Sequence, residues 1–114
     1  MLELNNISKT FYSDSGEEIR ALEGLNLLVR EGEFITLVGA TGCGKTTLLN
    51  LIAGLDSPDD GKLCLGEDLR LGENVAYVFQ HYILFPWRST LSNVSFGLQM
   101  RGIGRKNRKN EGIL

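Results

Sequence analysis

The sequence predicts an α/β domain in which a buried strand leads through a glycine-rich loop into a helix. Residues 34–38 (FITLV) form a short, continuous apolar and β-branched run, typical of a strand buried on both faces. Glycines are concentrated in residues 39–44, directly after this run. From Lys45 to Leu55 the apolar residues recur at helical spacing, and Gly54 is suited to end the helix.

Further segments with spaced or continuous apolar residues flank this unit. The small and acidic residues 13–18 (SDSGEE) separate two of these segments as a turn. Near the C-terminal end, Thr90 is placed to cap a helix over residues 91–100. The segments predicted as strands are 2–12, 19–29, 62–65 and 74–80.

Composition limits the class of protein. A chain of 114 residues is long enough for one small domain, and its 42% apolar and 23% charged residues are ordinary for a globular protein. The apolar runs are far shorter than the roughly 18 residues of a membrane span, and the N-terminus lacks a secretory leader, which indicates a cytoplasmic protein. Cys43 and Cys64 form no CxxC pair, and there is one histidine, which excludes a disulfide scaffold and a zinc site built on paired thiols.

Charge is distributed unevenly along the chain. Residues 1–88 hold seven basic and thirteen acidic side chains, whereas residues 89–114 hold five basic and one acidic. We interpret the basic end as a solvated helix end, because it is short and the rest of the chain is acidic. The alternative is contact with anionic lipid or nucleic acid. No nucleic-acid partner is expected.

Residues 39–46 (GATGCGKT) match the phosphate-binding pattern GxxxxGK[ST]. Its glycines allow left-handed backbone angles that direct several N–H groups at one centre, and the helix that follows adds the positive end of its dipole. Lys45 would reach the β- and γ-phosphates, and the Thr46 hydroxyl would ligate Mg²⁺. Cys43 lies beside Lys45 near a helix N-terminus, which favours a reactive thiol that bound nucleotide protects. The alternative is a strand-to-helix turn that binds nothing.

Three segments in order extend this match over nearly the whole chain: NISKTF, ALEGLNLLVREGEFITLVGATGCGKTTLLNLIAGLDSPDDGKL and VAYVFQHYILFPWRSTLSNVSFGL. Together they resemble the N-terminal half of an ATP-binding-cassette (ABC) transporter ATPase. The stretch LFPWRSTLSNVSFGLQMRG is most similar to the nitrate, sulfonate and taurine importers. The resemblance implies a P-loop NTPase (RecA-like) core with an N-terminal antiparallel β subdomain, truncated before the helical subdomain is complete. It implies the nucleotide-binding core at residues 1–88 and the start of the helical subdomain with the basic tail at residues 89–114.

The resemblance assigns roles to matching residues. Phe11 lies where the family places the aromatic ring that stacks on adenine, with Tyr12 as the second candidate and an ordinary strand-end hydrophobe as the alternative. Gln80 matches a glutamine that ligates Mg²⁺ and senses the γ-phosphate, the alternative being a polar strand end. Lys45 and Gln80 are therefore the expected catalytic residues, and Thr46 and Gln80 the metal ligands. The expected ATP-binding set is Phe11, Gly39, Ala40, Thr41, Gly42, Cys43, Gly44, Lys45, Thr46, Thr47 and Gln80.

The same resemblance implies protein partners. Tyr82 to Trp87 would dock on the membrane-spanning transporter subunit, although Trp87 filling the core is the alternative for that residue. A second ATP-binding subunit would complete the family dimer, and the protein would lie in the cytoplasm, peripheral on the inner face of the plasma membrane. His81 does not match the family's switch histidine and is expected on the surface.

Several family elements needed for hydrolysis are absent from these 114 residues: no apolar strand ends in Asp-Glu, and the LSGGQ signature, the D-loop and the switch histidine are not found. Residues 63–68 (LCLGED) are only a superficial match to the first of these, and they indicate a hairpin turn. We expect an ATPase by family whose chain alone binds ATP and hydrolyses it orders of magnitude more slowly than a full domain. The alternatives are a non-catalytic nucleotide-binding module acting through a partner, and an inactive gene remnant.

Overall fold

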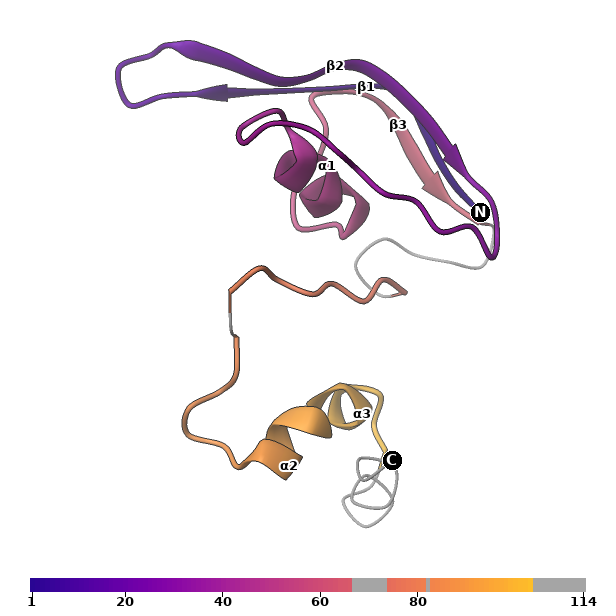
Figure 1. Ribbon diagram of the computed structural model, residues 1–114, viewed down its shortest axis with the longest axis vertical. Helices are drawn as coiled ribbons and strands as arrows, with labels where there is room; N and C mark the ends of the chain where they lie inside the picture. Colours follow the sequence, from indigo (N-terminus) through magenta and orange to yellow (C-terminus); the bar gives the residue numbers. More distant parts are fainter. Residues whose placement is uncertain (67–73, 82, 104–114) are drawn as a thin grey trace. The chain divides into compact units, whose positions relative to one another are not determined.

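The computed structural model describes residues 1–66, 74–81 and 83–103. The chain divides into two compact units, Met1–Tyr77 and Val78–Leu114. The predicted division near residue 88 is not tested by these units and stays a prediction, and Arg105 to Lys109 of the basic end lie outside the described residues. The elements are β1 (Leu2–Tyr12), β2 (Glu18–Val29), α1 (Lys45–Ile52), β3 (Asp60–Leu65), α2 (Thr90–Val94) and α3 (Phe96–Met100) (Figure 1).

The first unit contains a three-stranded antiparallel sheet with the strand order β2-β1-β3. The register places Leu4 of the central strand opposite Leu27 on β2 and Leu63 on β3. The predicted strands 2–12, 19–29 and 62–65 are thus confirmed. The predicted turn between the first two strands is also present, with Gly16 at a positive φ of 81°.

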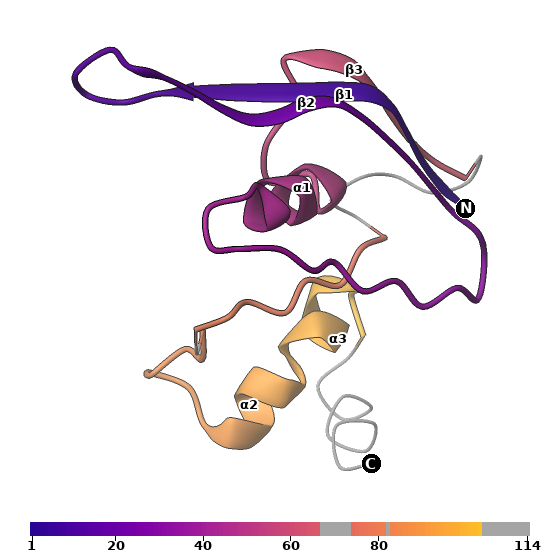
Figure 2. The ribbon, with the colours of Figure 1, turned by 45° about the horizontal axis from the view of Figure 1, so that its top comes forward.

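The core lies between the sheet and α1, which covers one face of the sheet (Figure 2). Leu4 and Ile7 of β1 are buried against Leu48 and Leu51 of α1. Since Leu48 and Leu51 are three residues apart, they lie on one side of the helix and face the sheet together. The apolar residues after Lys45 therefore form a helix whose apolar side is buried against the sheet, as their spacing predicted.

Gly54 ends α1 as predicted. Its φ is +70°, its N–H donates to the carbonyl of Leu51, and the N–H of Leu55 donates to the carbonyl of Asn50 at 2.9 Å. This pair of bonds is the Schellman arrangement, in which a left-handed residue after the helix satisfies its last carbonyl groups.

The predicted strand at residues 34–38 is not formed, and this prediction was wrong. Phe34 and Val38 are 92% and 90% exposed. A strand buried on both faces needs hydrogen-bonded neighbours and covering layers. Among the described residues, the sheet contains β2, β1 and β3 alone, so the apolar run has no strand beside it.

Residues 74–80 also form no strand, which corrects a second prediction. The same lack of a neighbouring strand within the described residues accounts for it. Tyr77 nevertheless attaches the first part of this segment to the helix of its own unit, because its hydroxyl donates to Asn50 Oδ1 at 3.1 Å.

The second unit contains two short helices instead of the single predicted one. Ser89, rather than Thr90, caps α2, and its Oγ accepts a hydrogen bond from the N–H of Ser92 at 3.3 Å. The helical run is interrupted at Ser95, between α2 and α3. Within the described residues, no helix has the length and apolar character to span a bilayer.

Candidate functional site

The loop before α1 has the backbone that its glycines permit. Gly42 and Gly44 take positive φ angles of 81° and 91°, and Gly44 is the N-cap residue of α1. A Cβ atom at Gly44 would collide with the carbonyl oxygen of Ala21 on β2. Glycine is therefore needed here for its φ angle and for the close approach of two backbones.

The side chain of Lys45 folds back onto the loop that precedes it. Its ammonium donates to the carbonyl of Gly39 at 2.7 Å and to that of Ala40 at 2.6 Å, and it lies 3.4 Å from Cys43 Sγ. Because the Lys45 ammonium lies next to the N-terminus of α1, its positive charge and the free backbone N–H groups of the first helical turn are close together. Such an arrangement attracts an anion.

A cavity of about 210 Å³ opens between the hairpin and the N-terminus of α1. Phe11 and the first turn of α1 line the same cavity, although they are more than thirty residues apart in sequence. Phe11 is 40% exposed. The lining residues are Phe11, Ile19, Ala21, Gly42, Gly44, Lys45, Thr46 and Thr47.

The cavity brings together an aromatic face, a cation and two hydroxyl groups. Thr46 is exposed in the first turn of α1, and its hydroxyl oxygen is a hard donor of the kind that Mg²⁺ accepts. An aromatic ring offers a stacking surface for a base. The combination is suited to a molecule with a phosphate at one end and a flat ring at the other.

Some predicted site residues do not line this cavity. Gly39 and Ala40 contribute through their carbonyl bonds to Lys45, and the exposed Cys43 through its sulfur contact with the same ammonium. Thr41 is exposed in the turn before Gly42. Gln80 belongs to the second unit, so its predicted role stays a prediction.

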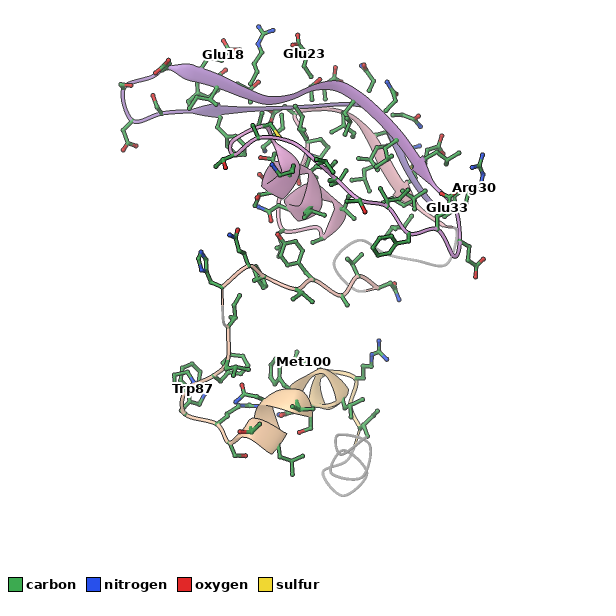
Figure 3. All side chains as sticks on the ribbon, viewed as in Figure 1. Glu18, Glu23, Arg30, Glu33, Trp87 and Met100 are labelled. Carbon is green, nitrogen blue, oxygen red and sulfur yellow. The ribbon has the colours of Figure 1, made fainter. Side chains whose placement is uncertain are left out.

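Two lining residues were not predicted from the sequence. Ile19 and Ala21 alternate on β2 and thus share the face that looks into the cavity. Arg20, between them, points to the other face, where it pairs with Glu18 at 3.0 Å and Glu23 at 3.1 Å. Figure 3 shows these two glutamates projecting from the hairpin on the side away from α1. The alternation of side chains along a strand is the sequence signal that could have placed Ile19 and Ala21 on the same face of β2.

The predicted docking segment lies in the second unit, and its first residue, Tyr82, is outside the described residues. Trp87 is 76% exposed, so the alternative that it fills the core is wrong (Figure 3). Phe85 is instead the centre of a local aromatic cluster, with its ring centroid 5.3 Å from that of Trp87 and 4.9 Å from that of Phe96. His81 is exposed, as expected.

Comparison with known sequences matches residues 22–113 to the family described as "ABC transporter". The ABC transporter ATP-binding protein MJ0412 of Methanocaldococcus jannaschii is 47% identical over 109 residues, covering 94% of this chain and 40% of its own. The nitrate import ATP-binding protein NrtD of Synechocystis sp. is 41% identical over 109 residues, covering 94% and 41%. The sulfate/thiosulfate import ATP-binding protein CysA of Pseudomonas putida is 44% identical over 111 residues, covering 92% and 32%.

Among solved structures, the ATP-binding cassette MJ0796, a dimer bound to ADP and Pi, superposes with a TM-score of 0.84 at 29% identity. The match covers 99% of this chain and 54% of that one. It confirms the predicted P-loop fold with its N-terminal antiparallel sheet. The chain spans 32–41% of the length of the three curated relatives named above.

Proposed function

Because the chain belongs to the ABC transporter family, we propose that residues 39–47 and Phe11 bind ATP with Mg²⁺ as part of an ABC-type ATPase. One observation carries this proposal: the ring of Phe11 and the residues Lys45, Thr46 and Thr47 line a single cavity. The ADP and Pi bound to the similar cassette MJ0796 support it.

Each part of the cavity then has a task. The N–H groups of the glycine loop and the ammonium of Lys45 hold the β- and γ-phosphates, and Thr47 contacts the α-phosphate from the first helical turn. Phe11 stacks on adenine, which needs little more than a flat π-face. The hydroxyl of Thr46 would hold Mg²⁺, and the family pattern assigns Gln80 as a further ligand; the ion would supply charge that offsets the negative phosphates.

In the proposed transporter, ATP binding and hydrolysis drive solute transport. Two relatives are named as import ATP-binding proteins, which supports an import system. We assign residues 82–87 to docking on the membrane-spanning subunit and a second ATP-binding subunit to the completed dimer, at the cytoplasmic face of the plasma membrane. The dimeric state of the similar cassette supports the second assignment.

Calorimetric titration with MgATP tests the binding site directly. Removing the ammonium in Lys45→Ala is expected to weaken binding by about tenfold or more, since hydrogen bonds to charged groups contribute roughly 1.5–3 kcal/mol. The matched control is Lys62→Ala, which removes an exposed lysine on β3 and is expected to leave affinity unchanged. Equal affinity in the wild-type chain and Lys45→Ala would overturn the proposal, provided that circular dichroism shows both to be folded.

Turnover separates the enzyme from a binding module. The 114-residue chain is expected to bind MgATP but to release phosphate orders of magnitude more slowly than a complete cassette, since positioning and charge stabilisation at the γ-phosphate provide most of the rate. Phosphate release at the rate of a complete cassette, lost in Lys45→Ala, would contradict this part of the proposal.

A further inference from the structure

Lys9 lies in a cluster of opposite charges beside the candidate site. Its Nζ is 2.9 Å from Asp56 Oδ1, 2.7 Å from the carbonyl oxygen of Ser57 and 3.5 Å from Asp59 Oδ1. The lysine side chain is only 12% exposed. The hydrogen bond to Asp56 raises the pKa of Lys9 and, seen from its partner, lowers the pKa of Asp56. Both groups therefore remain charged at neutral pH, and the lysine is held in one place.

The loop that carries Asp56, Ser57 and Asp59 also forms hydrogen bonds with the backbone of β1. Asp59 Oδ2 accepts a hydrogen bond from the N–H of Thr10 at 2.7 Å, and the N–H of Asp59 donates to the carbonyl of Ser8 at 2.9 Å. The two bonded residues, Ser8 and Thr10, are the chain neighbours of Lys9 on β1. These bonds fix the stretch of β1 that comes immediately before Phe11.

Phe11 stands next to this fixed lysine. Residues 9 and 11 share a face of β1, and Lys9 Nζ lies 5.5 Å from the centroid of the Phe11 ring, within the range of a cation–π contact. A partly exposed ring has several rotamers open to it. Fixing one of them in advance reduces the entropy lost when a ligand stacks on it.

The cluster also joins the two walls of the cavity. One wall is the first turn of α1, with Lys45 and Thr46, and the other is Phe11 on β1. Through its Schellman end, α1 leads directly into the loop that carries Asp56 and Asp59. The charge cluster therefore connects the end of the phosphate-binding helix to the strand that carries the ring.

We propose that Lys9, held by Asp56 and Asp59, is a positioning residue that orients the Phe11 ring for stacking on the nucleotide base. This inference rests on the proposed nucleotide site. Lys9 is not among the residues that line the cavity. It acts through Phe11 alone, so its contribution concerns the base and leaves the phosphates unaffected.

A double-mutant cycle tests this with two ligands, MgATP and inorganic tripolyphosphate with Mg²⁺, each titrated by calorimetry. Lys9→Met keeps the apolar stem and removes the charge. It is expected to raise the Kd for MgATP by about three- to tenfold, a part of what base stacking contributes, while the Kd for tripolyphosphate stays within about twofold. In a Phe11→Ala background, the same substitution is expected to change the Kd for MgATP by less than about twofold.

The matched control is Arg20→Met, which removes an ion-paired cation from the opposite face of the hairpin and is expected to change neither Kd. Equal losses for MgATP and tripolyphosphate in Lys9→Met would overturn the proposal, because the lysine would then support the phosphate site or the fold. An undiminished effect of Lys9→Met in the Phe11→Ala background would overturn it too. Failure of the wild-type chain to bind either ligand would instead overturn the proposed function, and the inference with it.

Discussion

Gly44 offers a sharp test of the loop geometry. An alanine at its φ of +91° costs roughly 1–2 kcal/mol, because the Cβ atom crowds the backbone in the left-handed region. The new Cβ would also collide with the carbonyl oxygen of Ala21 and lie 3.1 Å from Leu22 Cδ2. A backbone carbonyl in a strand cannot rotate away, so overpacking adds about 1–3 kcal/mol. Gly44→Ala is therefore expected to lower the free energy of unfolding by about 2–5 kcal/mol.

Gly42 provides the matched control within the same loop. Its φ is +81°, but apart from Gly42 and its two chain neighbours, no heavy atom of the described residues lies within 4 Å of a Cβ placed there. Gly42→Ala should then cost only the conformational part, about 1–2 kcal/mol. Urea unfolding followed by circular dichroism measures both variants. If their free energies of unfolding fall by the same amount, the close approach of Gly44 to β2 is not present in solution and the reasoning fails.

Three other predictions concern the core, pH and the loop cysteine. Leu51→Ala should lower the free energy of unfolding by about 2–5 kcal/mol because it leaves a cavity between α1 and the sheet, whereas the exposed Leu55→Ala should change it by less than about 0.5 kcal/mol; urea unfolding of both decides this. Because the pKa of Asp56 is lowered from 3.8, its stabilising contribution is present above that pH and is lost as pH falls through the lower folded value. The melting temperature of the wild-type chain should therefore drop more than that of Asp56→Asn between about pH 7 and about pH 3, and equal drops would contradict the assignment. Alkylation of the exposed Cys43 should slow in the presence of MgATP, and equal rates with and without it, measured by mass spectrometry, would contradict its place in the site.

Local signals in the sequence predicted much of the first unit. The strands at residues 2–12 and 19–29, and the helix that begins at Lys45, follow from apolar spacing and turn residues, which act over a few residues at a time. Gly54 ends the helix for a reason that is equally local, since only the conformation of one residue and two nearby hydrogen bonds are involved. The glycine and lysine positions of the loop could be predicted in the same way.

The apolar run at residues 34–38 shows the limit of such reasoning. Its composition indicates a preference for burial between neighbouring strands. Whether such strands are present depends on other parts of the chain, and composition does not report on them. The same applies to residues 74–80. The Ser89 cap differs from the predicted Thr90 by one residue, because both hydroxyl side chains are suitable and only the backbone path decides which one precedes the first helical turn.

The sequence by itself determined most local elements of the first unit and the chemical groups of the candidate site: the glycine-rich loop with its lysine, the helix that follows it and an aromatic residue at the end of the first strand. Only the tertiary structure decided that these groups share one cavity, because strand pairing and the packing of α1 on the sheet bring Phe11 close to Thr46. The contacts of Lys9 with Asp56 and Asp59 depend on the tertiary structure as well. These residues are 47 or more positions apart in the chain, and no local pattern records an ion pair that forms only when a helix leads its following loop back onto a strand.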